Sequence, residues 1–253
     1  METLISVERA RDILASHPLK WDIEEVELEF AQGRILAENI FARCDDPAFD
    51  NSSIDGWAVQ SSDLPESRIE IGKIFAGSEP ITTPLRPGEI YRIMTGAPIP
   101  HGSDALVMIE DGIHGQPRKE YIRRRGENIS IGELALSSGD IITPASCALA
   151  ATIGHTTLPV RSKLRIAIIP TGDELIEVGK PLKSGQIYDS NSVALASLIR
   201  KAGAEPIIIK PTIDDPKSLH SILDECAKEM DLILTSGGVS MGEKDFIRSS
   251  LLD

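Results

Sequence analysis

Three short segments in the second half of the chain carry groups that could hold a phosphate and a divalent cation. They are residues 171–174 (TGDE), the segment containing Asp215, and residues 236–242 (SGGVSMG), which are followed by Asp245. Carboxylates are hard oxygen ligands, and Mg²⁺ binds them together with water and substrate phosphates. The glycines of the third segment permit close approach of backbone N–H groups to a phosphate. Together the segments predict a Mg²⁺–phosphoryl site.

The elements around these segments predict a parallel sheet. Strands are expected at 164–169, 206–209 and 232–234, and helices at 191–202 and from Asp215-Pro216 onward. A strand–helix–strand order implies right-handed crossovers between parallel strands. Ligands bind beyond the carboxyl ends of such strands. Each of the three segments follows one strand, so we expect all three to open on one edge of the sheet.

Each segment also has a simpler interpretation. TGDE alone is compatible with a turn whose acids are solvated. Asp215 is compatible with a helix N-cap. Residues 236–238 are compatible with a tight turn from strand to helix. The residues by themselves leave these alternatives open.

Residues from about 44 to 142 predict a different, β-rich part. This part is rich in Gly and Pro, and short apolar runs alternate with turn residues. Asp55 lies in a polar loop before a strand, and Thr95 lies in a turn directly after one. Periodicity and spacing alone favour ordinary turn chemistry for both residues.

One concentrated basic run, Arg123-Arg124-Arg125, stands in this β-rich part. It is compatible with a solvated strand end or with a clamp for an anionic group. The chain has 253 residues and a formal net charge of −13. Nucleic-acid binding needs a basic footprint, so a small phosphorylated ligand is the better expectation.

Helix starts are readable at two further places. Ser6 can cap a helix with apolar positions at helical spacing, and Thr143-Pro144 reads as the N-cap and first residue of another. The three cysteines form no CxxC pair, so their spacing predicts neither a zinc site nor a disulfide framework. No secretory signal or membrane span is readable, so a cytoplasmic location without membrane partners is expected.

Six motifs taken together resemble the MoeA family of molybdopterin molybdenumtransferases, which includes the E domain of gephyrin. The motifs are FDNSSIDGWAV (49–59), RIMTGAPIPHGSDALVMIED (92–111), RRRGENIS (123–130), TGDEL (171–175), GQIYDSNS (185–192) and TSGGVSMGEKDF (235–246). They occur in the family's order and cover nearly the whole chain.

The resemblance implies an α/β multi-domain fold. A parallel-sheet αβα domain of the molybdopterin-binding type would comprise residues 1–22 and 163–253. An elongated linker domain would comprise 23–42 and 142–162, and a β-rich inserted domain 43–141. The implied reaction inserts molybdate into adenylylated molybdopterin with release of AMP and uses Mg²⁺. A homodimer is implied, with the cleft between the α/β domain of one subunit and the β-rich domain of the other, and a molybdopterin adenylyltransferase as upstream partner.

Roles for individual residues follow from the resemblance by position. Catalytic roles are implied for Asp55, Thr95, Glu174 and Asp245, and metal binding for Asp173, Glu174 and Asp245. Substrate binding is implied for Asp215, Ser236, Gly237, Gly238 and Ser240. Ser240 and Asp245 match positions associated with molybdate and with hydrolysis of the adenylate.

The sequence departs from the family pattern in two respects. It ends at Asp253, before the lysine- and proline-containing stretch and the further β domain of the family, which suggests a truncation, a split gene or a fragment. The activity of the chain alone is therefore left open. Asn128 stands where some relatives have Asp. Two alternatives remain: a molybdopterin adenylyltransferase-like enzyme, against which the β-rich part argues, and a non-catalytic molybdopterin-binding or scaffold module.

Overall fold

The structure, a computed structural model, describes residues 5–210 and 216–237. Its chain forms two compact units, which are described separately. The first contains residues 1–24 and 160–253, and the second contains residues 25–159. The α/β multi-domain fold expected from the sequence is confirmed. The finer division of the second unit into a linker part and a β-rich part stays a prediction.

The first unit is built on a three-stranded parallel sheet. The strand order is β14 (Glu205–Ile208), β11 (Arg165–Ile169) and β15 (Leu232–Thr235). Ala167 pairs with Ile207 on one side and with Ile233 on the other, which places β11 in the centre. Residues 166–169 are buried, as expected for a strand covered on both faces.

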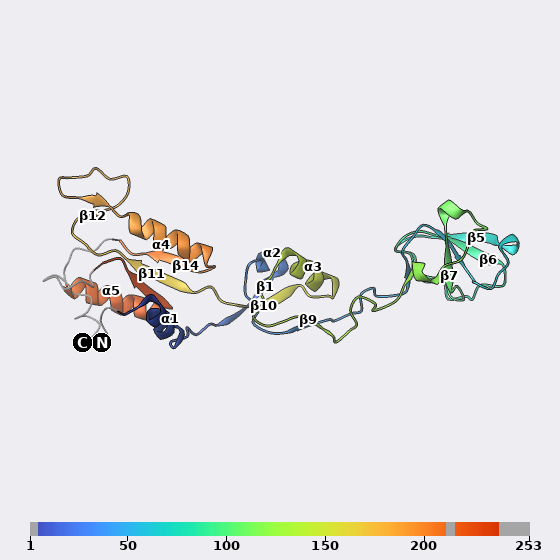
Figure 1. The fold of residues 1–253 in the computed structure, drawn as a ribbon, viewed down its shortest axis with the longest axis horizontal. Helices are drawn as coiled ribbons and strands as arrows, with labels where there is room; N and C mark the ends of the chain where they lie inside the picture. The colour runs from blue at the N-terminus through green and yellow to red at the C-terminus, as the bar shows by residue number, and fades with distance from the viewer. Residues whose placement is uncertain (1–4, 211–215, 238–253) are drawn as a thin grey trace. The chain divides into compact units, whose positions relative to one another are not determined.

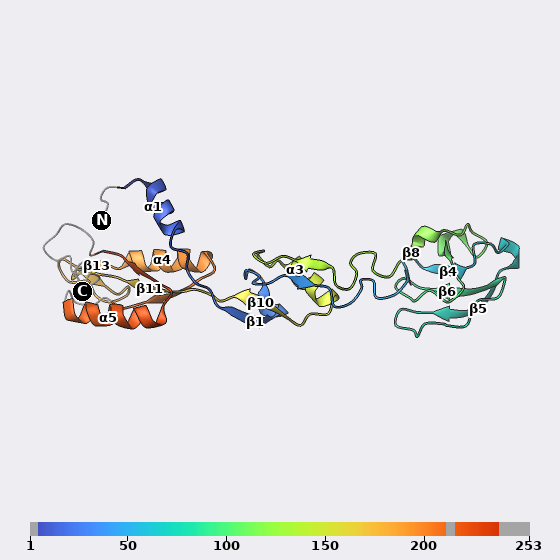
Figure 2. The ribbon, with the colours of Figure 1, turned by 90° about the horizontal axis from the view of Figure 1, so that it is seen from below.

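Helices cover both faces of this sheet. On one face, Leu219, Leu223 and Cys226 of α5 (Pro216–Glu229) form a core with Ala167 and Ile169. On the other face, α4 (Ser190–Lys201) contributes Ala196 and Ile199 to a core with Ile166 and Ile168. Figures 1 and 2 show α4 and α5 on opposite sides of β11. The arrangement is the expected αβα layering.

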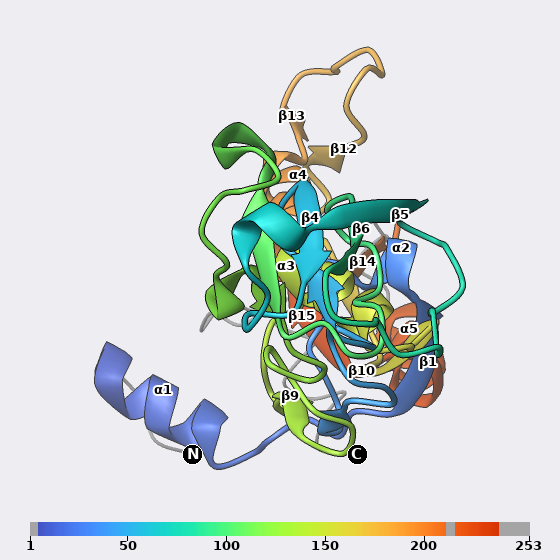
Figure 3. The same ribbon diagram turned by 90° about the vertical axis from the view of Figure 1, so that its right-hand side faces the viewer.

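Local sequence signals explain where the helices of this unit begin and end. Helix α1 (Val7–Ala15) follows Ser6, whose hydroxyl accepts from Arg9 N at 3.1 Å. Helix α4 follows Asp189, whose Oδ1 accepts from Ser192 N at 3.0 Å. It ends before Gly203, which has a φ of 86°. Short strands β12 (Leu175–Ile176) and β13 (Ile187–Tyr188) pair in parallel, and the loop between them extends outward (Figure 3).

The second unit contains a four-stranded sheet. Its order is β5 (Ile69–Ile74), β6 (Glu89–Ile93), β4 (Gly56–Val59) and β7 (Ala105–Met108), with β5 and β6 parallel and the other pairs antiparallel. One face packs in a core around Ala58, Ile74 and Ile93, and the other in a core around Val59 and Val107. Successive residues of a strand point to opposite faces, so each strand contributes side chains to both cores.

Smaller elements complete the second unit. The strands are β1 (Ile23–Glu27), β2 (Ile40–Phe41), β3 (Asn51–Ser52), β8 (Ile122–Arg123), β9 (Leu134–Leu136) and β10 (Thr157–Arg161); β1 and β10 pair at the boundary between the units. The helices are α2 (Leu28–Ala31), α3 (Pro144–Thr152) and the 3₁₀ helices η1 (Pro65–Ser67), η2 (Ile109–Asp111) and η3 (Lys119–Tyr121). Helix α3 begins with a capping box between Thr143 and Ser146, as the Thr143-Pro144 signal predicts.

Candidate functional site

The carboxyl edge of the three-stranded sheet brings two of the three predicted segments together. Ile169 of β11 pairs with Thr235 of β15, so the residues that follow these strands emerge side by side. A Cβ at Gly237 would lie 2.7 Å from Thr171 Oγ1. Residues 171–174 and 236–237 therefore share one edge, as the sequence predicts. Four further predicted site residues lie outside the described residues: Asp215, Gly238, Ser240 and Asp245.

Two hydroxyl groups at this edge are buried without a hydrogen-bond partner in the described part of the chain. They are Thr171 Oγ1 and Ser236 Oγ. Buried polar atoms are nearly always paired, because leaving one unpaired costs about 1–3 kcal/mol. A hydroxyl can donate one hydrogen bond and accept others. The two groups are therefore suited to the oxygen atoms of a polar ligand.

Two glycines make space at this edge. Gly172 has a φ of 142°, and a Cβ there would lie 2.7 Å from both carboxylate oxygens of Glu174. At Gly237 a Cβ would lie 2.9 Å from the carbonyl oxygen of Thr171, in addition to its contact with the hydroxyl. Any larger residue would displace these neighbours. The glycines thus leave room for the Glu174 carboxylate and the Thr171 hydroxyl.

Asp173 and Glu174 are the described carboxylates of this edge. Both residues are exposed, and Asp173 has a polar partner of its own. Within residues 5–210 and 216–237, no group of three or more His, Cys, Asp or Glu side chains is arranged to hold a metal ion. Mg²⁺ commonly uses one or two carboxylates and takes its other ligands from substrate phosphates and water. The two adjacent acids fit that donor set.

In the second unit, Asp55 and Thr95 lie together although 40 residues separate them. The backbone N–H and the hydroxyl of Thr95 donate to Asp55 Oδ1, at 2.8 and 2.9 Å. The first residue of β4, Gly56, pairs with Ile93 at the end of β6, which brings the two loops side by side. The sequence predicts only local turn hydrogen bonds for these two residues, but the Asp55 side chain accepts its hydrogen bonds from a loop 40 residues away.

These hydrogen bonds make Asp55 a stronger acid. Its pKa is lowered by the backbone N–H of Thr95 first, then by the Thr95 hydroxyl, and further by the positive charge of Arg92. No hydrogen bond from the described residues reaches Asp55 Oδ2. The exposed carboxylate therefore stays ionised and keeps one oxygen for a ligand that donates a hydrogen bond.

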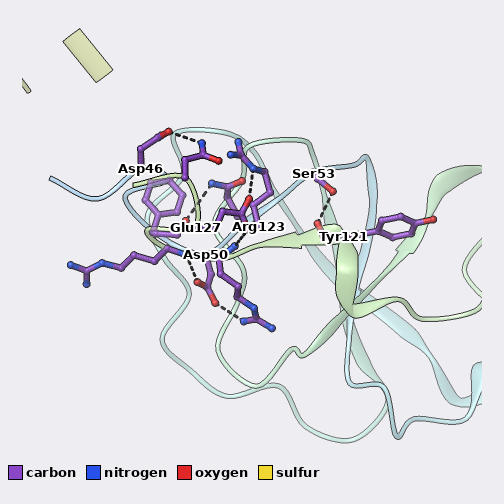
Figure 4. Close-up of polar contacts among 11 residues, drawn as sticks. Asp46, Asp50, Ser53, Tyr121, Arg123 and Glu127 are labelled. Carbon is purple, nitrogen blue, oxygen red and sulfur yellow. Dashed lines mark hydrogen bonds and ion pairs between the residues drawn. The ribbon is translucent and has the colours of Figure 1, made fainter. Parts of the chain in front are cut away.

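The arginine run 123–125 follows the solvated-strand-end alternative, since Arg123 ends β8 and the three exposed side chains are also paired with carboxylates. Arg123 Nε lies 2.8 Å from Glu127 Oε1, Arg124 Nη1 lies 2.6 Å from Asp50 Oδ2, and Arg125 Nε pairs with Asp45. Figure 4 shows several of these contacts beside the pair formed by Ser53 and Tyr121. Each guanidinium has a carboxylate partner. Arg124 and Arg125 therefore join two chain segments, and Arg123 pairs within its own segment.

Asp45 illustrates how strongly the two segments are joined. Its Oδ1 accepts from Ile131 N at 2.7 Å, and its Oδ2 accepts from Arg125. The backbone hydrogen bond from Ile131 is the larger cause that lowers the Asp45 pKa, followed by the bond from Arg125. The carboxylate remains ionised well below neutral pH, so the joint between the segments persists there.

Arg92, which has no role among the predicted site residues, lies near Asp55. Arg92 pairs with Trp57 across β6 and β4, and its guanidinium carbon lies 4.6 Å from the centre of the Trp57 ring. Trp57 Nε1 in turn donates to Glu70 Oε2 at 2.9 Å. Arg92 and Trp57 lie in two of the family motifs, but only the strand register brings them together, so local spacing does not indicate their contact.

The fold and this edge define an α/β protein of the kind that binds its ligand at the carboxyl ends of parallel strands, coupled to a β-rich unit. Residues 5–154 match the MoeA N-terminal region (domain I and II), and residues 167–253 match a family described as a probable molybdopterin binding domain. The chain belongs to the MoeA family.

Relatives and solved structures agree with this assignment. The chain is 40% identical to molybdopterin molybdenumtransferase 2 of Mycobacterium tuberculosis, over 89% of this chain and 59% of the relative. It is 38% identical to the molybdopterin molybdenumtransferase of Haemophilus influenzae, over 98% of this chain and 64% of the relative. A crystal structure of a molybdopterin biosynthesis MoeA protein from Pyrococcus horikoshii superposes with a TM-score of 0.84 at 31% identity, over 99% of this chain and 66% of the other. The chain thus spans less than two thirds of the length of these proteins.

Among the helices in the described ranges, none combines the length and the apolar character that crossing a bilayer requires.

Proposed function

We propose that the chain takes part in molybdenum cofactor biosynthesis, in the insertion of molybdate into adenylylated molybdopterin with release of AMP. The observation that carries this proposal is the pair of buried hydroxyls, Thr171 Oγ1 and Ser236 Oγ, without protein partners at the carboxyl edge of the sheet. This edge belongs to a domain that matches a molybdopterin-binding family. An orphaned hydroxyl pair beside two glycines is suited to phosphate oxygens, and the substrate contains a phosphoanhydride.

The residues of the first unit would bind and orient that phosphoanhydride. Thr171 and Ser236 would exchange hydrogen bonds with phosphate oxygens, and the glycines at 237 and 238 would let backbone N–H groups approach. The Glu174 carboxylate, held over Gly172, would face the same group. We assign Asp215 and Ser240 to substrate binding by their position in the family motifs.

Mg²⁺ is part of the proposal. Asp173 and Glu174 would hold it, with Asp245 as a third ligand, and the ion would supply neutralisation of charge on the phosphate oxygens. The protein's own contribution is to fix these carboxylates beside the hydroxyl pair. We assign Asp245 a role in cleavage of the adenylate, so Asp245→Asn is expected to abolish AMP release while the fold remains intact.

The residues of the second unit would contact the pterin or its phosphate. Asp55 would accept a hydrogen bond through Oδ2, since Thr95 occupies Oδ1. A carboxylate whose pKa is lowered remains an acceptor across the physiological range. Thr95 would act by holding this carboxylate in one orientation.

The assembly and location follow the same proposal. We propose a homodimer, an upstream molybdopterin adenylyltransferase that delivers the adenylylated substrate, and a cytoplasmic location. Free thiols at Cys44, Cys147 and Cys226 are in keeping with a reducing compartment. Sedimentation of the purified chain would test the homodimer, and a monomer at micromolar concentration would count against it.

The test is Mg²⁺-dependent release of AMP from adenylylated molybdopterin. The chain is assayed alone and with the C-terminal segment of a full-length relative, because the chain spans less than two thirds of the relatives' length. Thr171→Val and Ser236→Ala are expected to weaken molybdopterin binding by about tenfold each, from the loss of one hydrogen bond. Ser197→Ala is the control, because Ser197 is exposed and its hydroxyl bonds only to Val193 O within α4.

The outcomes separate the alternatives. AMP release that requires the added segment supports an enzyme formed from both parts. Binding without release in either case supports a molybdopterin-binding or scaffold module. Transfer of an adenylyl group to molybdopterin by the chain would support the adenylyltransferase-like alternative. Normal binding by Thr171→Val and Ser236→Ala would overturn the assignment of the hydroxyl pair.

A further inference from the structure

The four-stranded sheet of the second unit carries two neighbouring cations whose charged groups form no ion pair or hydrogen bond within the described residues. Lys73 of β5 and Arg92 of β6 are register partners in the parallel pair. The next pair along, Ile74 and Ile93, belongs to the buried core on one face of the sheet. Because successive residues alternate between faces, Lys73 and Arg92 lie together on the opposite face, with Trp57 as the next neighbour of Arg92.

Two like charges on directly adjacent strands destabilise a sheet. Among the described residues, neither Lys73 nor Arg92 forms an ion pair or a hydrogen bond through its charged group. The arginines at 123–125 in the same unit all have carboxylate partners. In a chain with a net charge of −13, two adjacent cations that form no direct ion pair call for an explanation, although the Asp55 carboxylate lies near Arg92.

The position of the Arg92 guanidinium is fixed in advance by an aromatic ring. The guanidinium carbon lies 4.6 Å from the centre of the Trp57 ring, and the ring is held by the hydrogen bond from Trp57 Nε1 to Glu70. Stacking on an aromatic face leaves the N–H groups at the edge of the guanidinium available to a planar or tetrahedral oxyanion. Such an arrangement lowers the entropy lost when a ligand binds.

The carboxylates on this face already have protein donors. Glu70 Oε2 accepts from Trp57, and Asp55 Oδ1 accepts from Thr95. Asp55 directly precedes β4, and its carboxylate lies close enough to Arg92 for the positive charge to contribute to its lowered pKa. The cations thus adjoin the Asp55–Thr95 pair, and that pair still has Asp55 Oδ2 for a donor group.

We propose that Lys73 and Arg92 form an anion-binding site for a phosphate group of the substrate, beside Asp55 and Thr95. The two cations take the phosphate oxygens, and Asp55 Oδ2 accepts a hydrogen bond from a neutral N–H group of the same ligand. Lys73 supplies a point charge, and Arg92 supplies two parallel donors. The identity of the ligand rests on the proposed function, but the site itself is tested without turnover.

Inorganic pyrophosphate is the probe, and the indole N–H of Trp57 is the reporter. The chain has two tryptophans, so each gives one indole signal in a ¹⁵N NMR spectrum, and Trp21 in the other unit reports separately on binding there. Titration is expected to shift the Trp57 signal in a saturable way. Lys73→Gln and Arg92→Gln are each expected to weaken this binding by about tenfold, the loss expected for one charge-assisted hydrogen bond.

Matched variants distinguish specific binding at Lys73 and Arg92 from an effect of the net charge of the protein. Arg118→Gln removes one positive charge from the same unit, where Arg118 is exposed and paired with Glu120, and is expected to leave the Trp57 titration unchanged. Arg92→Lys retains the charge but loses the planar donor edge, so it is expected to weaken binding. Lys73→Glu places a carboxylate beside Arg92, so it is expected to abolish binding and to raise the melting temperature.

The results also distinguish this proposal from the proposed function. No pyrophosphate-dependent shift of Trp57, or an equal shift in Lys73→Gln and Arg92→Gln, would overturn the anion site even if AMP release is normal. A saturable shift that both variants weaken would support the site even if AMP release fails. Equal weakening by Arg118→Gln would also overturn it, because the effect would then be one of net charge.

Discussion

The side-chain amide of Asn128 donates to Asp46 Oδ2 at 2.7 Å, between two chain segments that are 82 residues apart (Figure 4). The backbone joins the same segments, since Asp46 N donates to Ile129 O and Asn128 N donates to Asp46 O. Asn128 supplies a donor that an aspartate could not. The residue at position 128 is thus matched to the acid it meets in this chain.

Asn128→Asp is expected to destabilise the second unit at neutral pH. It replaces a hydrogen bond by two carboxylates at hydrogen-bonding distance, at a cost on the order of 1 kcal/mol for this exposed pair. The unfolding free energy measured by urea titration would show the loss at pH 7. The double variant Asp46→Asn with Asn128→Asp restores one donor and one acceptor and is expected to recover stability. A single variant as stable as the parent would contradict the role of the pair.

Removal of the Thr95 hydroxyl is expected to raise the pKa of Asp55. Thr95→Val keeps the side-chain shape and the backbone N–H but loses one of the two donors to Oδ1. Thr95→Ser keeps the hydroxyl and serves as the control. A ¹³C NMR titration of the Asp55 carboxyl would place the Val variant nearer the ordinary aspartate pKa than the Ser variant. Identical titration curves would show that the hydroxyl does not stabilise the ionised form.

Asp104 is expected to contribute to acid stability. Burial acts to raise its pKa, but hydrogen bonds from Lys119 and from Ser61 outweigh burial and lower the pKa to about 2. Lys119 Nζ lies 2.8 Å from Oδ2, and Ser61 N lies 2.6 Å from Oδ1. The folded pKa is below the unfolded one, so this stabilisation is present above the ordinary pKa of aspartate and is lost as pH falls toward about 2.

Asp104→Asn is therefore expected to lower the free energy of unfolding at neutral pH and to make that free energy less dependent on pH between about 4 and 2. Lys119→Gln should produce a smaller change in the same direction, because the Ser61 donors remain. Thermal unfolding followed at a series of pH values measures both effects. An unchanged pH dependence in Asp104→Asn would assign the acid sensitivity to other groups.

Gly56→Ala is expected to disrupt the four-stranded sheet. A Cβ at this position would lie 1.9 Å from the carbonyl oxygen of Val107 on the neighbouring strand, so the strands would have to separate. The expected cost is about 3 kcal/mol or more, at the upper end of what overpacking produces. Gly77→Ala is the control, because its Cβ would meet no atom within 4 Å and only its φ of 83° opposes the change. Equal stability of the two variants would refute the steric argument.

Much of the first unit follows from local signals in the sequence. Ser6 caps α1 and Gly203 ends α4, each through contacts within a few residues. The same holds in the second unit, where Thr143-Pro144 begins α3. The strand–helix–strand order predicts the parallel sheet, and with it the shared edge of residues 171–174 and 236–237. These features depend on sequence neighbours or on a general rule for parallel strands, so they could be predicted.

The second unit was less predictable because its chemistry depends on strand register. Asp55 bonds to Thr95 only because β4 pairs with β6, and Arg92 meets Lys73 and Trp57 only because of the alignment of three strands. Arg124 and Arg125 are paired with acids 74 and 80 residues away, which spacing alone does not reveal.

The sequence by itself determined the family, the helix ends and the residues that carry acids, hydroxyls and glycines to the edge of the parallel sheet. Only the tertiary structure decided which charged groups form ion pairs and which do not. The physical reason is that a carboxylate or a guanidinium acts through the groups within a few ångströms of it. In the second unit those groups come from strands and loops that are distant in the chain.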